Sequence, residues 1–277
     1  MTICRAATMF VTFLWAAIAH AEPATQCTAI GVCYCINGEL KLTLDKNIAI
    51  LRELISTQRA AGKAIGYLSV PLSSAGGGYF DINKDVAAKT KEHVLDRLGR
   101  NSVWVLDPGA PEADLPPANR RLTDLVPLKA AGADYMYMWT YVLEGVKGLG
   151  EDFDFVYFVG PSDFARHLHF TGFNDMAWAD ELFEAAKLRD KAFAQAVSDG
   201  KITKDGFRNY YTLRASVSFS NGAHDEWNIA RILNERRRGN AQYGNSGQLS
   251  IFFDGRPVPP SDYQASVASG YAGACTK

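Results

Sequence analysis

Four apolar runs of strand length, separated by helical patterns, constrain the fold most strongly. They are AIGYLSV (64–70), SVWVL (102–106), DFVYFV (154–159) and QLSIFF (248–253). Apolar side chains recur at helical spacing in several of the segments between them. Strands that are apolar throughout are typical of a parallel sheet with helices on both faces. We therefore expect an α/β fold, a three-layer sandwich around a central, mainly parallel sheet of flavodoxin- or Rossmann-like type.

The first residues have the features of a secretory signal peptide. Arg5 is the only charged residue before Glu22, residues 6–18 are largely apolar, and Ala19-His20-Ala21 is a small-x-small cleavage site. We expect cleavage near Ala21 and a mature protein that is periplasmic or secreted. No later stretch is apolar for long enough to span a bilayer. The rest divides into a cysteine-bearing extension, 22–44, and one α/β domain, 45–277, with a mainly helical insertion at about 164–213. Within and after this insertion we expect one long helical region over 175–198 and a short strand over 215–219.

The charge balance argues against two classes of partner. The chain has 29 Lys and Arg residues and 30 Asp and Glu residues. Loss of Arg5 with the signal peptide leaves a net charge of −2. Such a balance gives no reason to expect nucleic acid or an anionic membrane as the partner.

Four cysteines remain in the mature chain: Cys27, Cys33, Cys35 and Cys275. An even number of cysteines in an exported chain predicts two disulfides. Cys33 and Cys35 are too close to pair comfortably, which leaves two connectivities, and each ties Cys275 to the N-terminal extension. A hairpin is expected there around Asn37-Gly38. The alternative is a metal site around Cys33-x-Cys35, but no histidine lies nearby and export favours oxidation, so we expect no metal.

Glu226 is the leading candidate for a functional residue. At about 100° per residue, it falls inside the apolar stripe of the helix expected over 221–238, whose start is signalled by Ser220 and Gly222. A carboxylate on a buried helix face is costly unless it is paired, hydrogen-bonded or facing a cavity. Two interpretations stay open. Glu226 is a nucleophile or general acid/base in a pocket, or it is a structural carboxylate paired with an arginine or with backbone groups.

The carboxyl ends of the expected strands carry residues suited to a binding site. Ligands of parallel sheets bind beyond these ends, where Pro71-Leu-Ser73, Asp107-Pro-Gly109 and Gly160-Pro-Ser-Asp163 lie. Asp163 is a candidate substrate-binding carboxylate, and its alternative role is to cap the helix that follows. The G-x-S-x-G motif of serine hydrolases and the H-E-x-x-H motif of zinc proteases are absent.

Taken in order, these motifs resemble those of the nucleoside 2-deoxyribosyltransferase-like superfamily. Residues 65–73 are similar to its opening strand and loop, and Asp107-Pro108 to the end of its next strand. The segment from Ser220 to Glu226 is similar to its S-x-G-A-x-x-E helix, which carries the catalytic glutamate. The resemblance covers roughly residues 64–255. The chain departs from the family pattern at Val70, where the family has glycine, and in the long insertion before Ser220.

The resemblance implies N-glycosidic chemistry on a nucleoside- or nucleotide-like small molecule, with no cofactor. The expected catalytic residues are Glu226 and Asp163. Glu226 would attack or stabilise the anomeric carbon as the base leaves, and Asp163 would hold the base or a hydroxyl. Export favours hydrolysis over transfer, because no acceptor base is concentrated outside the cell. The alternative is a non-catalytic exported binding or interaction module on the same fold. The expected substrate-binding residues are Tyr67, Pro71, Ser73, Ser220, Gly222 and Asn228.

Overall fold

The structure is a computed structural model that describes residues 22–72, 78–110, 130–169, 176–213, 220–243, 247–259 and 266–276. Three predictions lie outside the described residues: the signal peptide (1–21), the position of Ser73, and a short strand over 215–219. Among the described residues, no helix combines the length and the apolar character needed to cross a membrane.

The centre of the fold is a five-stranded sheet in the order β4-β3-β5-β6-β7. Its strands are β3 (Ala64–Ser69), β4 (Val103–Leu106), β5 (Phe155–Phe158), β6 (Ser250–Phe253) and β7 (Arg256–Pro257). The first four are parallel to their neighbours, and β7 is antiparallel to β6. The predicted α/β class with a mainly parallel sheet is therefore confirmed. β7 was not expected; it follows a turn at Asp254-Gly255, both at positive φ, as in a tight hairpin.

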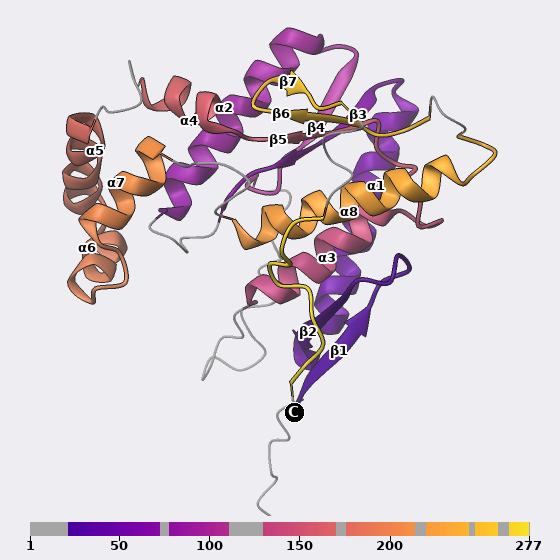
Figure 1. Ribbon diagram of the computed structural model, residues 1–277, viewed down its shortest axis with the longest axis horizontal. Helices are drawn as coiled ribbons and strands as arrows, with labels where there is room; N and C mark the ends of the chain where they lie inside the picture. The colour runs from indigo at the N-terminus through magenta and orange to yellow at the C-terminus, as the bar shows by residue number, and fades with distance from the viewer. Residues whose placement is uncertain are drawn as a thin grey trace, which may run out of the picture.

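Helices cover both faces of this sheet, as Figure 1 shows. Successive strand residues point to opposite faces, so β3 sends Tyr67 to one apolar cluster and Leu68 to the other. The Tyr67 cluster includes residues of α1 (Lys41–Ala60), α3 (Gly132–Glu144) and α8 (Asn221–Arg238). The Leu68 cluster includes residues of α2 (Phe80–Leu98) and α4 (Pro161–Leu168).

The predicted helical insertion contains α4 and three further helices, α5 (Met176–Arg189), α6 (Lys191–Ser198) and α7 (Lys204–Leu213). Figure 1 shows α5, α6 and α7 grouped at the left of the molecule. A single helical region was expected over 175–198, but it breaks at Asp190, whose carboxylate accepts from the N–H groups of Ala192 and Phe193 and so starts α6. The division of the chain into a domain and an insertion stays a prediction.

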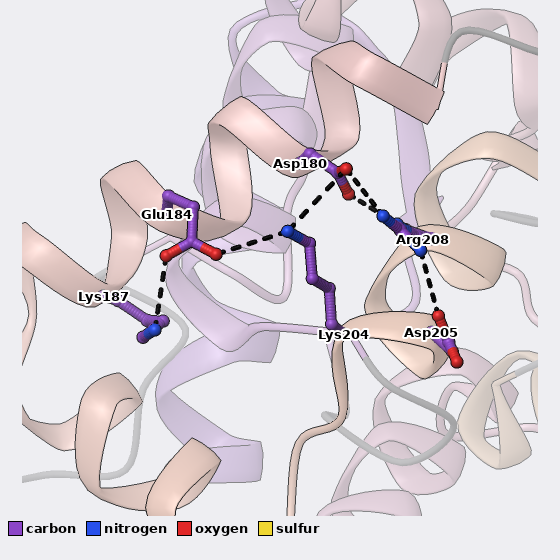
Figure 2. Close-up of polar contacts among 6 residues, drawn as sticks. All are labelled: Asp180, Glu184, Lys187, Lys204, Asp205 and Arg208. Carbon is purple, nitrogen blue, oxygen red and sulfur yellow. Dashed lines mark hydrogen bonds and ion pairs between the residues drawn. The ribbon is translucent and has the colours of Figure 1, made fainter.

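Ion pairs join α5 to α7 (Figure 2). Arg208 binds both carboxylate oxygens of Asp180, at 2.5 and 2.6 Å. Lys204 lies between Asp180 and Glu184, 3.7 and 3.3 Å from their oxygens. Each of the three helices also contributes one phenylalanine ring to a cluster in which every ring contacts the other two: Phe183 of α5, Phe193 of α6 and Phe207 of α7. The three helices therefore form one packed unit.

The N-terminal extension is a disulfide-bonded hairpin of β1 (Pro23–Cys27) and β2 (Cys33–Asn37). Cys27 is bonded to Cys33 and Cys35 to Cys275. The prediction of two disulfides, with Cys275 tied to the extension, is confirmed, and the structure selects one of the two connectivities left open by the sequence.

The predicted position of the hairpin turn was wrong. The strands are joined by residues 28–32, where Gly31 has a φ of 86°. Asn37 does not form a turn; its side-chain oxygen accepts from the N–H of Glu39 and caps a short 3-10 helix, η1 (Gly38–Leu40). An asparagine-glycine pair supports either structure, and here the backbone N–H of Asn37 is held by Asp134 of α3. This tertiary contact favours the cap.

Candidate functional site

Glu226 lies in the second turn of α8, with its side chain buried against β3. The helix begins at Ser220, whose hydroxyl accepts from the N–H of Ala223 at 3.2 Å, as a helix cap does. A Cβ at Gly222 would lie 3.4 Å from the sulfur of Met136 in α3, an ordinary van der Waals distance. Ser220 thus has a structural role, and substrate contact by Ser220 or Gly222 stays a prediction.

Two hydroxyl groups of β3 hold the Glu226 carboxylate. The hydroxyl of Tyr67 donates to Oε1 at 2.5 Å, and that of Ser69 donates to Oε2. The two residues reach the same carboxylate because residues i and i+2 of a strand share one face. No arginine pairs with Glu226 among the described residues. The sequence left open a structural role for Glu226 with an arginine or backbone groups as its partner. The described residues show no such arginine.

The surroundings of Glu226 bring its pKa close to neutral pH. Burial raises the pKa of Glu226 to about 7, and the charge of the adjacent Asp225 adds to this, while the hydroxyls of Ser69 and Tyr67 act in the opposite direction. Burial and the Glu226 charge raise the pKa of Tyr67 well above its usual value. Tyr67 therefore remains a hydrogen-bond donor at neutral pH, while Glu226 exists in both protonation states.

Aromatic rings and a second carboxylate surround this pair. Tyr67 contacts the rings of Trp139 and Phe153, with centroids 5.9 and 6.1 Å away. Asp107 follows β4, the neighbour of β3, and its negative charge contributes to the raised pKa of Tyr67. Its carboxylate also accepts from the N–H of Gly109 at 2.8 Å. The carboxyl ends of β3 and β4 thus bring Asp107 near the Tyr67–Glu226 pair.

Asp163 does not join this group. It is the third residue of α4 and accepts from the N–H of Gly160, which caps that helix, and it pairs with Arg166 at 3.0 Å. Both of its oxygens lie 3.0 Å from the hydroxyl of Tyr157, whose side chain belongs to the cluster on the face opposite Glu226. The capping alternative considered from the sequence describes these contacts, although the cap residue itself is Gly160.

Asn228 also lies apart from Glu226. Its side-chain amide binds both the N–H and the carbonyl of Val267, each at 3.0 Å. It lines a pocket of about 410 Å³ together with Arg231 and residues of the C-terminal segment, 266–276. Glu226 is not among the described residues that line this pocket. The amide of Asn228 therefore serves to attach the C-terminal segment to α8.

Pro71 is the remaining expected residue that the structure describes. It lies two positions beyond Ser69, and its carbonyl accepts from the hydroxyl of Tyr210 in α7 at 3.2 Å. Of the expected site residues, the structure thus brings together Tyr67 and Glu226, with Pro71 and Ser220 on the same two chain segments.

Ser69 is one of two residues near Glu226 that the sequence analysis did not single out. The signal was present, since Ser69 is two residues from Tyr67 in a predicted strand and shares its face.

Asp225 is the second residue that was missed. Its buried carboxylate accepts from the N–H groups of Gly270, Tyr271 and Ala272. No local pattern in the sequence indicates those donors, which lie more than 40 positions away.

No family model, no curated protein and no solved structure matches the chain. In the part of the chain that the structure describes, no three His, Cys, Asp or Glu side chains come together as metal ligands would. The function is therefore inferred from the geometry of the Glu226 site.

Proposed function

We propose that the protein is an exported enzyme acting on N-glycosidic bonds, a deoxyribosyltransferase-like enzyme or hydrolase of nucleosides or nucleotides. The observation that carries this proposal is the pairing of the buried Glu226 carboxylate with two hydroxyls. Two other buried carboxylates of the chain accept from backbone N–H groups: Glu144 from Ala29 and Ile30, and Asp225 from the C-terminal segment. The partners of Glu226 among the described residues are instead two side-chain hydroxyls, those of Tyr67 and Ser69, which suits a carboxylate that must react.

The strand order supports this proposal. In chain order, β3, β4, β5 and β6 are arranged 2-1-3-4, as in the flavodoxin-like sheet. We propose on this basis that the fold is a three-layer sandwich of flavodoxin- or Rossmann-like type. Ligands of such sheets bind at the carboxyl ends of the strands, where the order reverses. Here that reversal lies between β3 and β5, and Ser69 is the last residue of β3.

The chemistry follows from a carboxylate held beside an anomeric carbon. As the C–N bond breaks, its electron pair leaves with the base and positive charge develops on the sugar. The ionised Glu226 stabilises that charge or bonds to the carbon. Water or an acceptor base then bonds to the carbon, displacing Glu226 if it had bonded, and the proton that the incoming group loses balances the proton that the departing base takes up. Tyr67 and Ser69 keep the two carboxylate oxygens in a fixed orientation. Asp163 is left out of this scheme, because its contacts lie on the other face of the sheet.

The test is release of free base by the purified mature protein. It is incubated with a panel of nucleosides, nucleotides and NAD, and the products are separated by liquid chromatography. Glu226→Gln should abolish the release, because the amide carries no negative charge. Glu235→Gln is the matched control on the same helix, since Glu235 is exposed and forms an ion pair with Arg231 at the surface. No base release across the panel, at high concentrations of folded protein, would contradict the proposal.

The alternative is an exported binding or interaction module that no longer catalyses. The helices α4–α7, which stand between β5 and α8, favour it because they supply surface that the reaction does not need. In that case the wild type should release no base, and Glu226→Gln should leave ligand binding unchanged.

A further inference from the structure

α7 contributes two adjacent tyrosines to a chain of hydrogen bonds. The N–H of Tyr79 donates to the Tyr211 hydroxyl at 2.9 Å, which donates to Oδ1 of Asn83 at 2.8 Å. Nδ2 of Asn83 donates to the Tyr210 hydroxyl at 3.1 Å, which donates to the Pro71 carbonyl at 3.2 Å. Each group thus donates to the next in one direction, an arrangement in which successive bonds strengthen one another.

This chain of hydrogen bonds joins the carboxyl end of β3 to the start of α2. Pro71 lies two residues after Ser69, and Tyr79 is the residue at which α2 begins. Gly78 permits the contact, since a Cβ there would lie 2.7 Å from the Tyr210 ring. The two tyrosines therefore fix the positions at which the chain leaves β3 and enters α2.

α7 is itself firmly held. Its Arg208 and Lys204 side chains bind α5 (Figure 2), and the Phe207 ring contacts Phe183 of α5 with centroids 5.3 Å apart. After α7, the next described residue is Ser220, at the start of α8. α7 thus contacts the end of the strand that supplies Tyr67 and Ser69 and precedes the helix that supplies Glu226.

We propose that Tyr210 and Tyr211 are positioning residues for the Glu226 site, holding the end of β3 so that Ser69 keeps its hydrogen bond to the carboxylate. The expected effect on catalysis rests on the proposed function. The effect of the two tyrosines on the position of β3 and on the ionisation of Glu226 does not. Loss of the Tyr210 hydroxyl removes the bond to the Pro71 carbonyl and lets the end of β3 move. Loss of the Tyr211 hydroxyl acts one step further away, because it releases Asn83, which donates to the Tyr210 hydroxyl. The ionised form of Glu226 is then less well stabilised by Ser69.

The experiment compares Tyr210→Phe and Tyr211→Phe, which delete a hydroxyl and keep the ring. Tyr141→Phe is the matched control, because the Tyr141 hydroxyl donates to a carbonyl, that of Cys27, at 3.3 Å in another part of the fold. Each protein is titrated against its own Glu226→Gln derivative, so that the difference isolates one carboxyl group. The groups facing that carboxyl are Tyr67 and Ser69 of β3 and Asp225 of α8, together with Tyr34 of β2, whose pKa the Glu226 charge helps to raise.

For the wild type and for Tyr141→Phe, the titration curve minus that of the Glu226→Gln derivative should show the release of one proton near pH 7. Both tyrosine variants should ionise Glu226 about three- to tenfold less readily, the effect of losing one hydrogen bond, so the midpoint moves to higher pH. Base release should follow the same shift, with its rise displaced to higher pH. A role in stability alone would lower the melting temperature and leave the midpoint unchanged.

Unchanged midpoints in both folded tyrosine variants would overturn the proposal. A shifted midpoint without base release from any substrate would support the positioning role and count against the enzyme. Amide exchange in the wild type provides the measurement if a variant fails to fold. The Tyr79 amide should exchange as slowly as the buried amides of α7, and fast exchange at Tyr79 beside a protected α7 would also overturn the proposal.

Discussion

Replacing Glu226 by glutamine should stabilise the protein more at pH 8 than at pH 5. Burial raises the pKa of Glu226 from 4.5 to about 7 in the folded chain. Between these values the folded state keeps a proton that the unfolded chain has lost, so the stability of the wild type falls as the pH rises through this window. At about 1.4 kcal/mol per pH unit, the whole window corresponds to about 3 kcal/mol, and most of it lies between pH 5 and pH 8.

Glutamine has the shape of the protonated acid and does not titrate, so the variant avoids this loss. The assay is urea-induced unfolding at both pH values with the disulfides intact, which gives the free energy of unfolding of each protein. Glu235→Gln is the control, with a side chain that is 64% exposed; its effect should be the same at both pH values. If Glu226→Gln gains nothing over the wild type between pH 5 and pH 8, the reasoning about the buried carboxyl is wrong.

Three other substitutions test separate contacts. Tyr67→Phe or Ser69→Ala should move the midpoint of Glu226 ionisation above 7, because each removes a donor that favours the carboxylate; a difference titration against the corresponding Glu226→Gln double variant measures it. Asp163→Ala should lower the free energy of unfolding by about 2 kcal/mol, because the Gly160 N–H at the start of α4 and the Tyr157 hydroxyl both lose their acceptor. The same substitution should leave the midpoint of Glu226 ionisation unchanged. Replacing Cys35 and Cys275 by serine should cost about 2–4 kcal/mol in urea unfolding, and peptide mapping of the non-reduced wild type should find this pair and no free thiol.

The strands and the helix α8 could be predicted because their signals are local. The apolar run at 64–70 gives β3 within one residue, and Ser220 gives the start of α8. The break at Asp190 was missed because the apolar pattern continues across it, while the break depends on a side chain capping the next helix. The hairpin turn was misplaced for a related reason, since Asn37 suits both a turn and a cap and only its contact with Asp134 decides between them.

The site was predicted in part. The position of Glu226 on the apolar face of its helix indicated burial, and the strand that precedes Pro71 supplied Tyr67. Asp163 and Asn228 have the right chemistry and follow the right elements, but their partners, Tyr157 and Val267, are set by the tertiary structure. Residue type and spacing therefore predict which element carries a polar group and not which face of the sheet it serves.

The attachment of the segment 266–276 makes the folded state depend on residues that lie far apart in the sequence. Cys35 finds its partner 240 positions later, and the buried Asp225 finds its donors only at 270–272. A chain that ends before this segment has an unpaired thiol in its hairpin and a buried carboxylate without donors, next to Glu226. Because a buried carboxylate without partners is costly, such a chain is less stable and more of it is open to proteases. Loss of residues 266–276 therefore changes the surroundings of Glu226 although none of them binds its carboxylate.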